Sequence, residues 1–558
     1  MKIAAGGILV VAFVLAFVVG GIFDEKQKKK RFIAKLRNDY GKPSAKEYPE
    51  GRLKSIKGYA MRGKKEFLID DVTWNDLEMD RVFQQIDFCY SAAGEEYLYG
   101  MLRSPQLNTE SFEELEKYVD YFSQHEEERI RLQTLFAKVG RTGKYSIFDY
   151  LDSLDVVEQK RNVKHYIGIL AIFISGILCF WHIEVGGFMA SVVILCNIMG
   201  YFSQKAEILP YLTTFSYLLR LIDSVKEFSA LHMQILDEDV KIMECSCRKC
   251  RKFYRGSFLV TSMNQTSSNP LEFIWDYVKM ILHVDLIKFN QMLGEAKRLK
   301  EDFIQIFEIA GKLEAYISIS AYRASLDYYA VPVLKCGIKH MEAEELYHPL
   351  ISNPVANSFK EKRGMLLTGS NASGKSTFLK TVAINSILAQ TIHTVLAKGY
   401  SASMFRVYTS MALRDDLEFG DSYFIVEIKA LKRILDAAQV GETPILCFID
   451  EVLRGTNTVE RIAASCEILE NMSDSRFMCF AATHDIELTE LLHDSFENYH
   501  FEETIENDDV LFNYRLIKGK ATTRNAIKLL GVLGFEEKII QKANRRAEDF
   551  MTKGVWIK

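Results

Sequence analysis

The sequence is short of proline, of paired cysteine spacings and of net charge. It has 9 prolines and 10 cysteines in 558 residues, and the cysteines lack the regular spacing of a disulfide framework. We therefore expect reduced thiols and no disulfides. Because 70 Lys and Arg nearly balance 74 Asp and Glu, net charge argues neither for nor against a nucleic-acid partner. With no internal repeat or low-complexity tract, the length predicts about three or four domains of roughly 150 residues.

One segment has the pattern of a nucleotide-phosphate cradle. Residues 364–385, GMLLTGSNASGKSTFLKTVAIN, pass from an apolar strand through a glycine-framed loop into a helix. Gly369 and Gly374 let backbone N–H groups turn toward phosphates, Lys375 reaches the outer phosphates, and the Ser376 hydroxyl is placed to hold Mg²⁺. The predicted nucleotide-binding residues are Gly369, Ser370, Asn371, Ala372, Ser373, Gly374, Lys375, Ser376 and Thr377.

A second motif is an apolar strand that ends in two acids. PILCFIDE, residues 444–451, finishes with Asp450 and Glu451, as in a Walker B motif. We expect Asp450 to hold Mg²⁺ together with Ser376, and Glu451 to polarise the attacking water as a general base. The alternative is that the acids cap the N-terminus of a helix. The complete phosphate loop upstream favours the catalytic interpretation.

A third apolar strand ends in a histidine. FMCFAATHD, residues 477–485, places Thr483 and His484 at the carboxyl end of a strand, where an open α/β sheet presents groups to a ligand. We expect His484 to sense or stabilise charge on the transferred phosphoryl group. A structural histidine is the alternative. The predicted catalytic residues are therefore Glu451, His484 and Lys375.

Three apolar runs predict transmembrane helices. Ile3 to Phe23 has the ~20 residues that span a bilayer and precedes a basic cluster, which predicts a signal anchor with that cluster in the cytosol. A cleaved signal peptide is the alternative. Tyr166–Trp181 and Val185–Phe202 predict a tight hairpin, because Lys and Arg flank the pair on its outer sides and are missing from the connection. Two buried core helices of a soluble domain are the alternative for the hairpin.

The remaining sequence predicts a helical region and then an α/β region. After the anchor at 1–24, residues 25–65 are polar and basic, which is typical of a juxtamembrane linker that lies on anionic lipid or forms a solvated tether. Apolar spacings of three and four predict helices over 66–334, interrupted by the hairpin at 166–202. Strands alternate with helices over 335–558, which predicts a mostly parallel sheet covered by helices. The clearest strands are Met365–Thr368, Ile445–Ile449 and Met478–Ala482.

Four ordered motifs resemble the ATPase domain of the MutS DNA mismatch-repair proteins. TGSNASGKST is similar to their phosphate loop, DDLEFGDSYFIVEIKALKRIL (415–435) to their signature segment, DEVLRGTNT to their extended Walker B motif, and ATHDIELTEL to their switch-histidine segment. Residues 514–543 resemble the closing strand and helical dimerisation element of that domain. Residues 69–80 and 321–334 resemble the start and end of the family's helical lever domain.

The resemblance implies an α/β P-loop (ABC-type) ATPase domain preceded by an all-α lever domain, here with three transmembrane helices. It implies ATP and Mg²⁺ as cofactors and a homodimer in which two ATPase domains meet head to tail. Asn371 in the phosphate loop and Ser422 in the signature segment would then share the contact to the γ-phosphate across the dimer.

The chain departs from the family pattern in several places. Only the anchor and the basic linker precede the lever, so we expect the mismatch-reading domains to be lacking. Pro354 and Val355 stand where the family usually has an aromatic residue that stacks on adenine, and Leu453 stands at a usual glycine position. The base preference is therefore less certain than the phosphate binding.

A basic run, Lys241 to Arg255, is the candidate for contact with DNA phosphates, because Phe253 and Tyr254 lie among its Lys and Arg residues. A solvated or lipid-facing helix is the alternative. Cys245, Cys247 and Cys250 lie within the run and offer three thiolates to Zn²⁺, or remain free thiols, since no fourth ligand is evident.

The sequence therefore predicts a multi-pass membrane protein with three spans and with its lever and ATPase domains in the cytosol. Its predicted function is ATP-dependent DNA binding by a membrane-anchored, dimeric MutS-type ATPase, with mismatch or damage sensing implied by resemblance. The alternative is a membrane mechanochemical or scaffold ATPase that does not bind DNA. A transporter ATPase is a third possibility, opposed by the lack of an LSGGQ-type signature.

Overall fold

The chain forms two compact units in a computed structural model. The structure describes residues 20, 23–44, 46–62, 65–143, 146–156, 158, 161–261, 277–337, 339–370, 373–411, 423–454, 456–506, 509–520, 527, 530 and 534–553. The first unit comprises Met1–Arg62, Asp87–Gly100 and Tyr118–Ala324, and the second comprises Gly63–Ile86, Met101–Lys117 and Ser325–Lys558. Segments 63–86 and 101–117 thus group with the α/β region and not with the helical region to which their sequence pattern assigned them.

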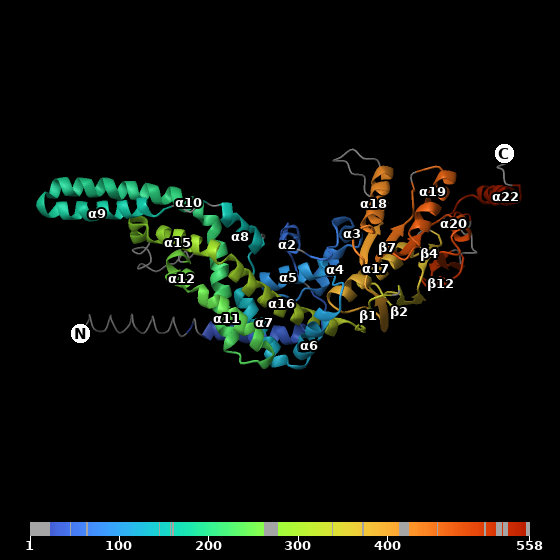
Figure 1. The fold of residues 1–558 in the computed structure, drawn as a ribbon, viewed down its shortest axis with the longest axis horizontal. Helices are drawn as coiled ribbons and strands as arrows, with labels where there is room; N and C mark the ends of the chain where they lie inside the picture. Colours follow the sequence, from blue (N-terminus) through green and yellow to red (C-terminus); the bar gives the residue numbers. More distant parts are fainter. Residues whose placement is uncertain are drawn as a thin grey trace. The chain divides into compact units, whose positions relative to one another are not determined.

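The elements follow the predicted order, helices first and strands later (Figure 1). The helices are α2 (Arg52–Ala60), α3 (Asp71–Asp76), α4 (Met79–Ile86), α5 (Ala92–Arg103), α6 (Glu110–Gln124), α7 (Glu126–Val139), α8 (Ile147–Val156), α9 (Val163–Trp181), α10 (Ile183–Ser229), the 3₁₀ helix η1 (Gln234–Leu236), α11 (Asp237–Lys249), α12 (Arg251–Tyr254), α13 (Phe258–Thr261), α15 (Val284–Arg298), α16 (Lys300–Ser325), α17 (Lys375–Thr391), α18 (Tyr423–Ala437), α19 (Thr458–Asn471), α20 (Glu487–Leu491) and α22 (Glu537–Lys553). The strands are β1 (Val333–Lys335), β2 (Met341–Leu346), β3 (Asn357–Glu361), β4 (Gly364–Thr368), β5 (Gly399–Ser403), β6 (Arg406–Ser410), β7 (Ile445–Asp450), β8 (Phe477–Ala482), β9 (Phe496–His500), β10 (Glu503–Glu506), β11 (Asp509–Phe512) and β12 (Ile517–Lys518).

The second unit is built on a six-stranded sheet with the order β12-β9-β4-β8-β7-β6. The pairings β9–β4, β4–β8, β8–β7 and β7–β6 are parallel, and β12 is antiparallel to β9. The predicted mixed α/β fold with a mostly parallel sheet is confirmed. A four-stranded sheet, β1-β5-β2-β3, and the hairpin β10-β11 complete the strands of the described residues.

The central strands are buried on both faces, which explains why their sequences are continuous apolar runs. On one face, Ile445 and Cys447 of β7 pack in a core cluster with residues of α18, α19 and α20. On the other face, Phe480 of β8 contacts Phe359 with ring centroids 5.9 Å apart, and Phe359 contacts Phe378 of α17 at 5.7 Å. The sheet is therefore the middle of three layers, and its carboxyl edge is left for ligands.

The first unit is helical among its described residues and contains two long apolar helices. α9 and the Ile183–Leu209 part of α10 are long and apolar enough to cross a membrane, and 11% of each 18-residue apolar window is buried. The two helices lie side by side (Figure 1). Such exposure argues against the alternative of buried core helices. The predicted first span, Ile3 to Phe23, lies almost wholly outside the described residues, so three spans stay a prediction.

The second of these helices continues far beyond its apolar part. α10 runs to Ser229, and Tyr201, Leu212 and Phe215 along it are buried in the helical core. At about 1.5 Å per residue, such a helix is about 70 Å long. One uninterrupted helix therefore connects the apolar hairpin with the core of the first unit.

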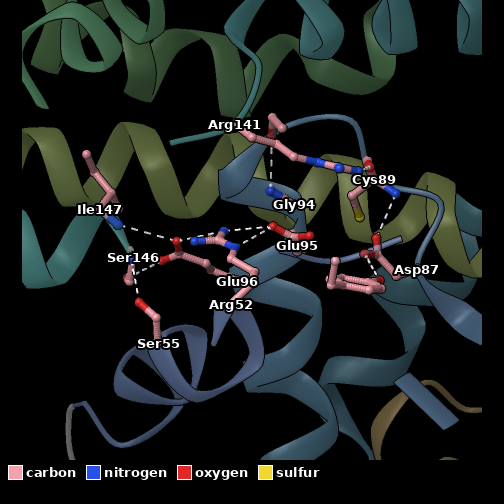
Figure 2. Close-up of polar contacts among 12 residues, drawn as sticks. Arg52, Ser55, Asp87, Cys89, Gly94, Glu95, Glu96, Arg141, Ser146 and Ile147 are labelled. Carbon is pink, nitrogen blue, oxygen red and sulfur yellow. Dashed lines mark hydrogen bonds and ion pairs between the residues drawn. The ribbon is translucent and has the colours of Figure 1, made fainter. Parts of the chain in front are cut away.

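Residues 46–62 differ from the expected tether, because they contain α2 and take part in a buried ion-pair network (Figure 2). Arg52 of α2 is 1% exposed and donates to Glu95 at 2.7 Å and to Glu96 at 3.2 Å, both on α5. Lys46 pairs with Asp87 and lies 3.2 Å from Glu95. This segment is thus fixed by charge pairing within the first unit. Its Lys and Arg residues had indicated a solvated or lipid-facing linker.

Candidate functional site

The predicted motif residues meet at the carboxyl edge of the six-stranded sheet. In the parallel register, Leu367 of β4 lies beside Ala482 of β8, and Ala482 lies beside Asp450 of β7. The carboxyl ends of β4, β8 and β7 therefore lie next to one another at the same edge of the sheet. The phosphate-loop residues, the acidic pair and His484 follow these strand ends, so the sheet brings together segments that are far apart in sequence.

The loop after β4 is shaped by two glycines at which a side chain would be strained. Gly369 has φ +142° and Gly374 has φ +106°, a region that residues with a Cβ rarely adopt. A Cβ on Gly369 would lie 2.9 Å from the backbone oxygen of Phe501. Lys375, the first residue of α17, turns back over the loop, and its Nζ donates to the carbonyl oxygens of Gly369 at 2.8 Å and Ser370 at 2.7 Å.

Glu451 lies at the centre of a charged cluster. Its Oε1 is 2.9 Å from Nε2 of His484, and its Oε2 is 2.7 Å from Nε of Arg454. Burial acts to raise the pKa of Glu451, but the hydrogen bond from His484 and the charge of Arg454 outweigh it and lower the pKa. Glu451 is therefore ionised near neutral pH, as a general base must be.

The backbone just after β7 is strained at a position where the chain departs from the family pattern. Glu451 has φ +65° and Leu453 has φ +58°, both in the left-handed region. A glycine adopts this conformation freely, whereas an L residue pays about 1–2 kcal/mol. The family's usual glycine thus matches the local conformation, and this chain has Leu453 there. Leu453 is 5% exposed and packs in the sheet's core cluster, which offsets the strain.

These residues line a cavity of about 520 Å³ at the sheet edge. Lys375, Ser376, Asp450, Glu451 and His484 all border it. Ser373 also borders it, and its Oγ is buried without a hydrogen-bond partner among the described residues. These features fit a phosphate group: the buried Ser373 hydroxyl can donate to it, Lys375 brings a positive charge, and the two glycines let the loop backbone turn around it. Ser376 and Asp450 offer the oxygen ligands that suit Mg²⁺.

Three residues that the sequence motifs did not single out hold this arrangement in place. Glu427 of α18 is 1% exposed and accepts the backbone N–H of Arg454 at 3.1 Å, which anchors the segment after β7. Arg461 of α19 pairs with Asp485 at 2.6 Å, and the backbone N–H of Asp485 donates to the Thr483 hydroxyl oxygen at 3.0 Å. Both contacts fix the turns that carry Glu451 and His484. A charged residue on a helix gives no sequence signal for such a role.

The cavity is bordered by an aromatic residue, Tyr514, that does not stand at the position expected from the sequence. Pro354 and Val355 line the cavity as expected, and Tyr514 lines it too. A Cβ on Gly374 would lie 3.0 Å from Cδ1 of Tyr514, so the ring lies against the phosphate loop. Asn357 holds this segment by donating to the Tyr514 carbonyl at 3.0 Å. The sequence did not indicate that Tyr514 borders the cavity, because Tyr514 lies far beyond the phosphate loop in sequence.

Other predicted residues lie outside this cluster or outside the described residues. Asn371, Ala372 and Ser422 belong to the second group, as do residues 415–422 of the signature segment. In the basic run, Lys249 pairs with Asp302 at 2.6 Å and Phe253 is buried. Among the described residues no group of three or more His, Cys, Asp or Glu side chains is placed to hold a metal ion, so the three cysteines of the run do not converge.

Comparison with known proteins gives one family and a set of relatives. Residues 365–551 match the family model MutS domain V. The chain is 31% identical over 270 residues to the DNA mismatch repair protein MutS of Thermotoga maritima, covering 46% of this chain and 33% of the relative. The corresponding protein of Thermotoga neapolitana is 29% identical over 350 residues, 59% of this chain and 42% of the relative. The corresponding protein of Leptospira interrogans is 30% identical over 297 residues, which cover 50% of this chain and 34% of the relative. The chain thus spans well under half the length of these relatives.

Proposed function

The chain belongs to the MutS family through residues 365–551, and from this premise we propose that it is an ATPase whose hydrolysis site is the cavity at the sheet edge. The observation that carries the proposal is the convergence of Lys375, Asp450, Glu451 and His484 on one cavity. They come from the ends of three strands, since Asp450 and Glu451 both stand at the end of β7, and each suits one task in phosphoryl transfer.

The proposed reaction assigns a role to each of these residues. Backbone N–H groups of the phosphate loop and Nζ of Lys375 bind the β- and γ-phosphates of ATP, with Nζ leaving its present carbonyl partners. Glu451 accepts a proton from the attacking water, which adds to the γ-phosphorus as the bond to the β-phosphate oxygen breaks. His484, held by Glu451, stabilises charge on the transferred group. Ser376 and Asp450 would hold Mg²⁺, which when bound neutralises phosphate charge.

Tyr514 is the proposed partner of the nucleotide base. Its ring borders the cavity beside the phosphate loop. Pro354 and Val355, which also border the cavity, have no aromatic ring. Stacking of a base on an aromatic face is worth about 1–3 kcal/mol and tolerates different bases. Tyr514 therefore supplies the stacking surface that the sequence at 354–355 lacks.

The working form is proposed to be a homodimer. By resemblance, Ser422 of one chain would reach the γ-phosphate bound to the other, together with Asn371 of the phosphate loop. Hydrolysis would then depend on association of two chains. The family's relatives are named DNA mismatch repair proteins, which supports DNA as the ligand whose binding ATP controls.

One observation favours the alternative of a membrane mechanochemical or scaffold ATPase. The apolar parts of α9 and α10 are mostly exposed, and α10 runs uninterrupted into the helical core. In both versions we propose that this hairpin inserts in a membrane and that the soluble parts lie in the cytosol. In the alternative, α10 moves the hairpin and DNA has no role.

A hydrolysis assay tests the proposal and separates its two versions. Purified full-length protein is assayed for phosphate release from ATP, alone, with duplex, mismatched or branched DNA, and in lipid nanodiscs. Stimulation by DNA supports the DNA-binding version. Stimulation by lipid with no effect of any DNA supports the alternative. A rate no higher than that of the Glu451→Gln variant contradicts both.

A further inference from the structure

A basic groove lies in the first unit, apart from the residues of the nucleotide cavity. Its open volume is about 740 Å³, and it is lined by Lys252, Arg255, Gly256, Lys288, Gln291, Gly294 and Glu295. Three cations therefore face one carboxylate. That carboxylate, Glu295, is already paired with Arg298 at 2.6 Å. The groove is left with an excess of positive charge.

Lys288 is the unusual member of this group. Its side chain on α15 is 9% exposed, and its Nζ donates to the Lys252 carbonyl at a long 3.4 Å. Among the described residues no carboxylate forms an ion pair with Lys288, Lys252 or Arg255. Burial lowers the pKa of Lys288; the nearby charge of Glu295 acts in the other direction, and that of Arg255 adds to the lowering. A buried ammonium group that forms no ion pair is costly, and a bound anion would reduce that cost.

The groove lies at the base of the apolar hairpin. The side chain of Asn162, just before α9, donates to the Ile287 carbonyl at 3.3 Å and accepts from Asn290 at 2.8 Å, on either side of Lys288. Asn162 precedes Tyr166, the first residue of the predicted span, by about 6 Å of helix. On the second helix, Tyr201 near the end of the other span bonds Asp285 at 2.7 Å, about one turn before Lys288. Lys288 therefore lies beside the ends of the two predicted spans, where lipid head groups would be expected.

We propose that the groove formed by Lys252, Arg255 and Lys288 binds the phosphate of an anionic phospholipid head group. The inference rests on the proposed insertion of the hairpin in a membrane. Two exposed cations reach the phosphate from α12 and the turn after it, and Lys288 closes the site from α15. The turn requires Gly256, whose φ is +75° and whose Cβ position lies 3.7 Å from Cε of Lys288. Phe258, 63% exposed, follows this turn and offers an apolar contact for the acyl chains.

The test compares two double variants of the full-length protein in detergent. K252Q/R255Q neutralises the groove at exposed positions, so the fold is preserved. K241Q/R248Q removes the same charge from the same basic run outside the groove. The probe is dioctanoyl phosphatidylglycerol, and affinity is taken from the rise in melting temperature with lipid concentration. At about 1 kcal/mol per cation, K252Q/R255Q binds about 10- to 30-fold more weakly, whereas K241Q/R248Q stays within about twofold of wild type.

Three other ligands, phosphatidylcholine, inorganic phosphate and duplex DNA, test which ligand the groove binds, and an alkaline wash tests membrane insertion. Dioctanoyl phosphatidylcholine should give little stabilisation, because it carries no net charge. Inorganic phosphate that stabilises as well as the lipid would overturn the lipid source, and loss of duplex-DNA binding without loss of lipid binding would assign the groove to nucleic acid. Equal weakening in both double variants would overturn the site. Alkaline carbonate washing of membranes separately tests insertion, since protein released by the wash refutes the membrane placement and leaves the ATPase proposal intact.

Discussion

Two clusters of charged side chains in this chain differ in what surrounds them: one is enclosed by the helical unit, and the other borders a cavity. In the helical unit, Arg52, Glu95, Glu96 and Asp87 are buried (Figure 2). Arg52 pairs with Glu95 and Glu96, and the half-buried Lys46 pairs with Asp87 and Glu95. At the sheet edge of the α/β unit, the charges border an open cavity, and a buried hydroxyl there lacks a partner among the described residues. Internal pairing makes the first cluster a structural tie. Charges of the second cluster are also paired with one another, but they border a cavity that the Ser373 hydroxyl faces without a partner among the described residues, as suits a ligand site.

The largest expected effect is on catalysis at the open cluster. Glu451→Gln removes the proposed base and keeps the size of the side chain, so ATP turnover should fall about 10²- to 10⁴-fold while ATP binding is retained. Steady-state phosphate release and equilibrium nucleotide binding measure the two effects. Glu442→Gln, at an exposed position in the loop before β7, is the control and should leave turnover unchanged. Equal turnover in the two variants would remove Glu451 from the mechanism.

Breaking the closed cluster should instead affect stability. Arg52→Met leaves Glu96 buried without its cation, and loss of one partner of a buried pair costs about 3–5 kcal/mol. Burial already raises the pKa of Glu96 to about 7, although Arg52 acts in the other direction, so protonation of Glu96 limits the cost. Urea unfolding followed by circular dichroism measures the change.

The control for the closed cluster is an exposed pair in the same unit. Lys138→Met removes the partner of Glu227, from which its Nζ is 2.6 Å away. Because both side chains are about half exposed, the variant should lose less than about 1 kcal/mol. If Arg52→Met is no more destabilising than Lys138→Met, the network is not a structural tie.

The composite-site hypothesis predicts an effect at a residue outside the described part of the chain. Ser422→Ala should lower turnover by about 10²-fold, the usual effect of removing one donor to a developing charge, and leave nucleotide binding nearly intact. The turnover of wild type should also rise with protein concentration as dimers form. Ser473→Ala serves as control, because the Ser473 hydroxyl donates to the Glu470 carbonyl just after α19. Unchanged turnover in Ser422→Ala rejects the shared site.

The smallest effect concerns the strained backbone beside Glu451. Leu453→Ala and Leu453→Gly both lose the buried side chain, but only glycine relieves the left-handed conformation at φ +58°. Strain relief of about 1–2 kcal/mol exceeds the extra entropy of glycine, about 0.5–1 kcal/mol. The glycine variant should therefore unfold at higher urea concentration than the alanine variant. The reverse order would show that the backbone relaxes without cost.

The three motif strands could be read from the sequence, and the contacts between distant segments could not. β4, β7 and β8 were predicted within a residue or so of their ends, because strands buried on both faces are apolar runs and the polar residues begin where the sheet edge begins. Tyr514 could not be predicted as a cavity residue, since only chain closure brings it beside the phosphate loop.

Charged residues were the hardest to place from sequence. Arg52 and Lys46 have the pattern of a solvated linker, yet both form ion pairs with carboxylates that lie on another segment. The basic run likewise divides on folding, since Lys249 is paired with Asp302 while Lys252 and Arg255 join Lys288 in a groove. Pairing depends on tertiary contacts, and the charge of one segment does not reveal it.

Equilibrium binding of ATP to the purified full-length protein tests the central claim, that the open cluster is a nucleotide site, most directly. Wild type should bind ATP, and Lys375→Ala should bind about 10- to 100-fold more weakly, because it loses a charged hydrogen bond to the phosphates. Lys432→Ala, which removes an exposed lysine paired with Asp436 on α18, should bind as wild type does. No binding by wild type, or equal binding by wild type and Lys375→Ala, would contradict the account.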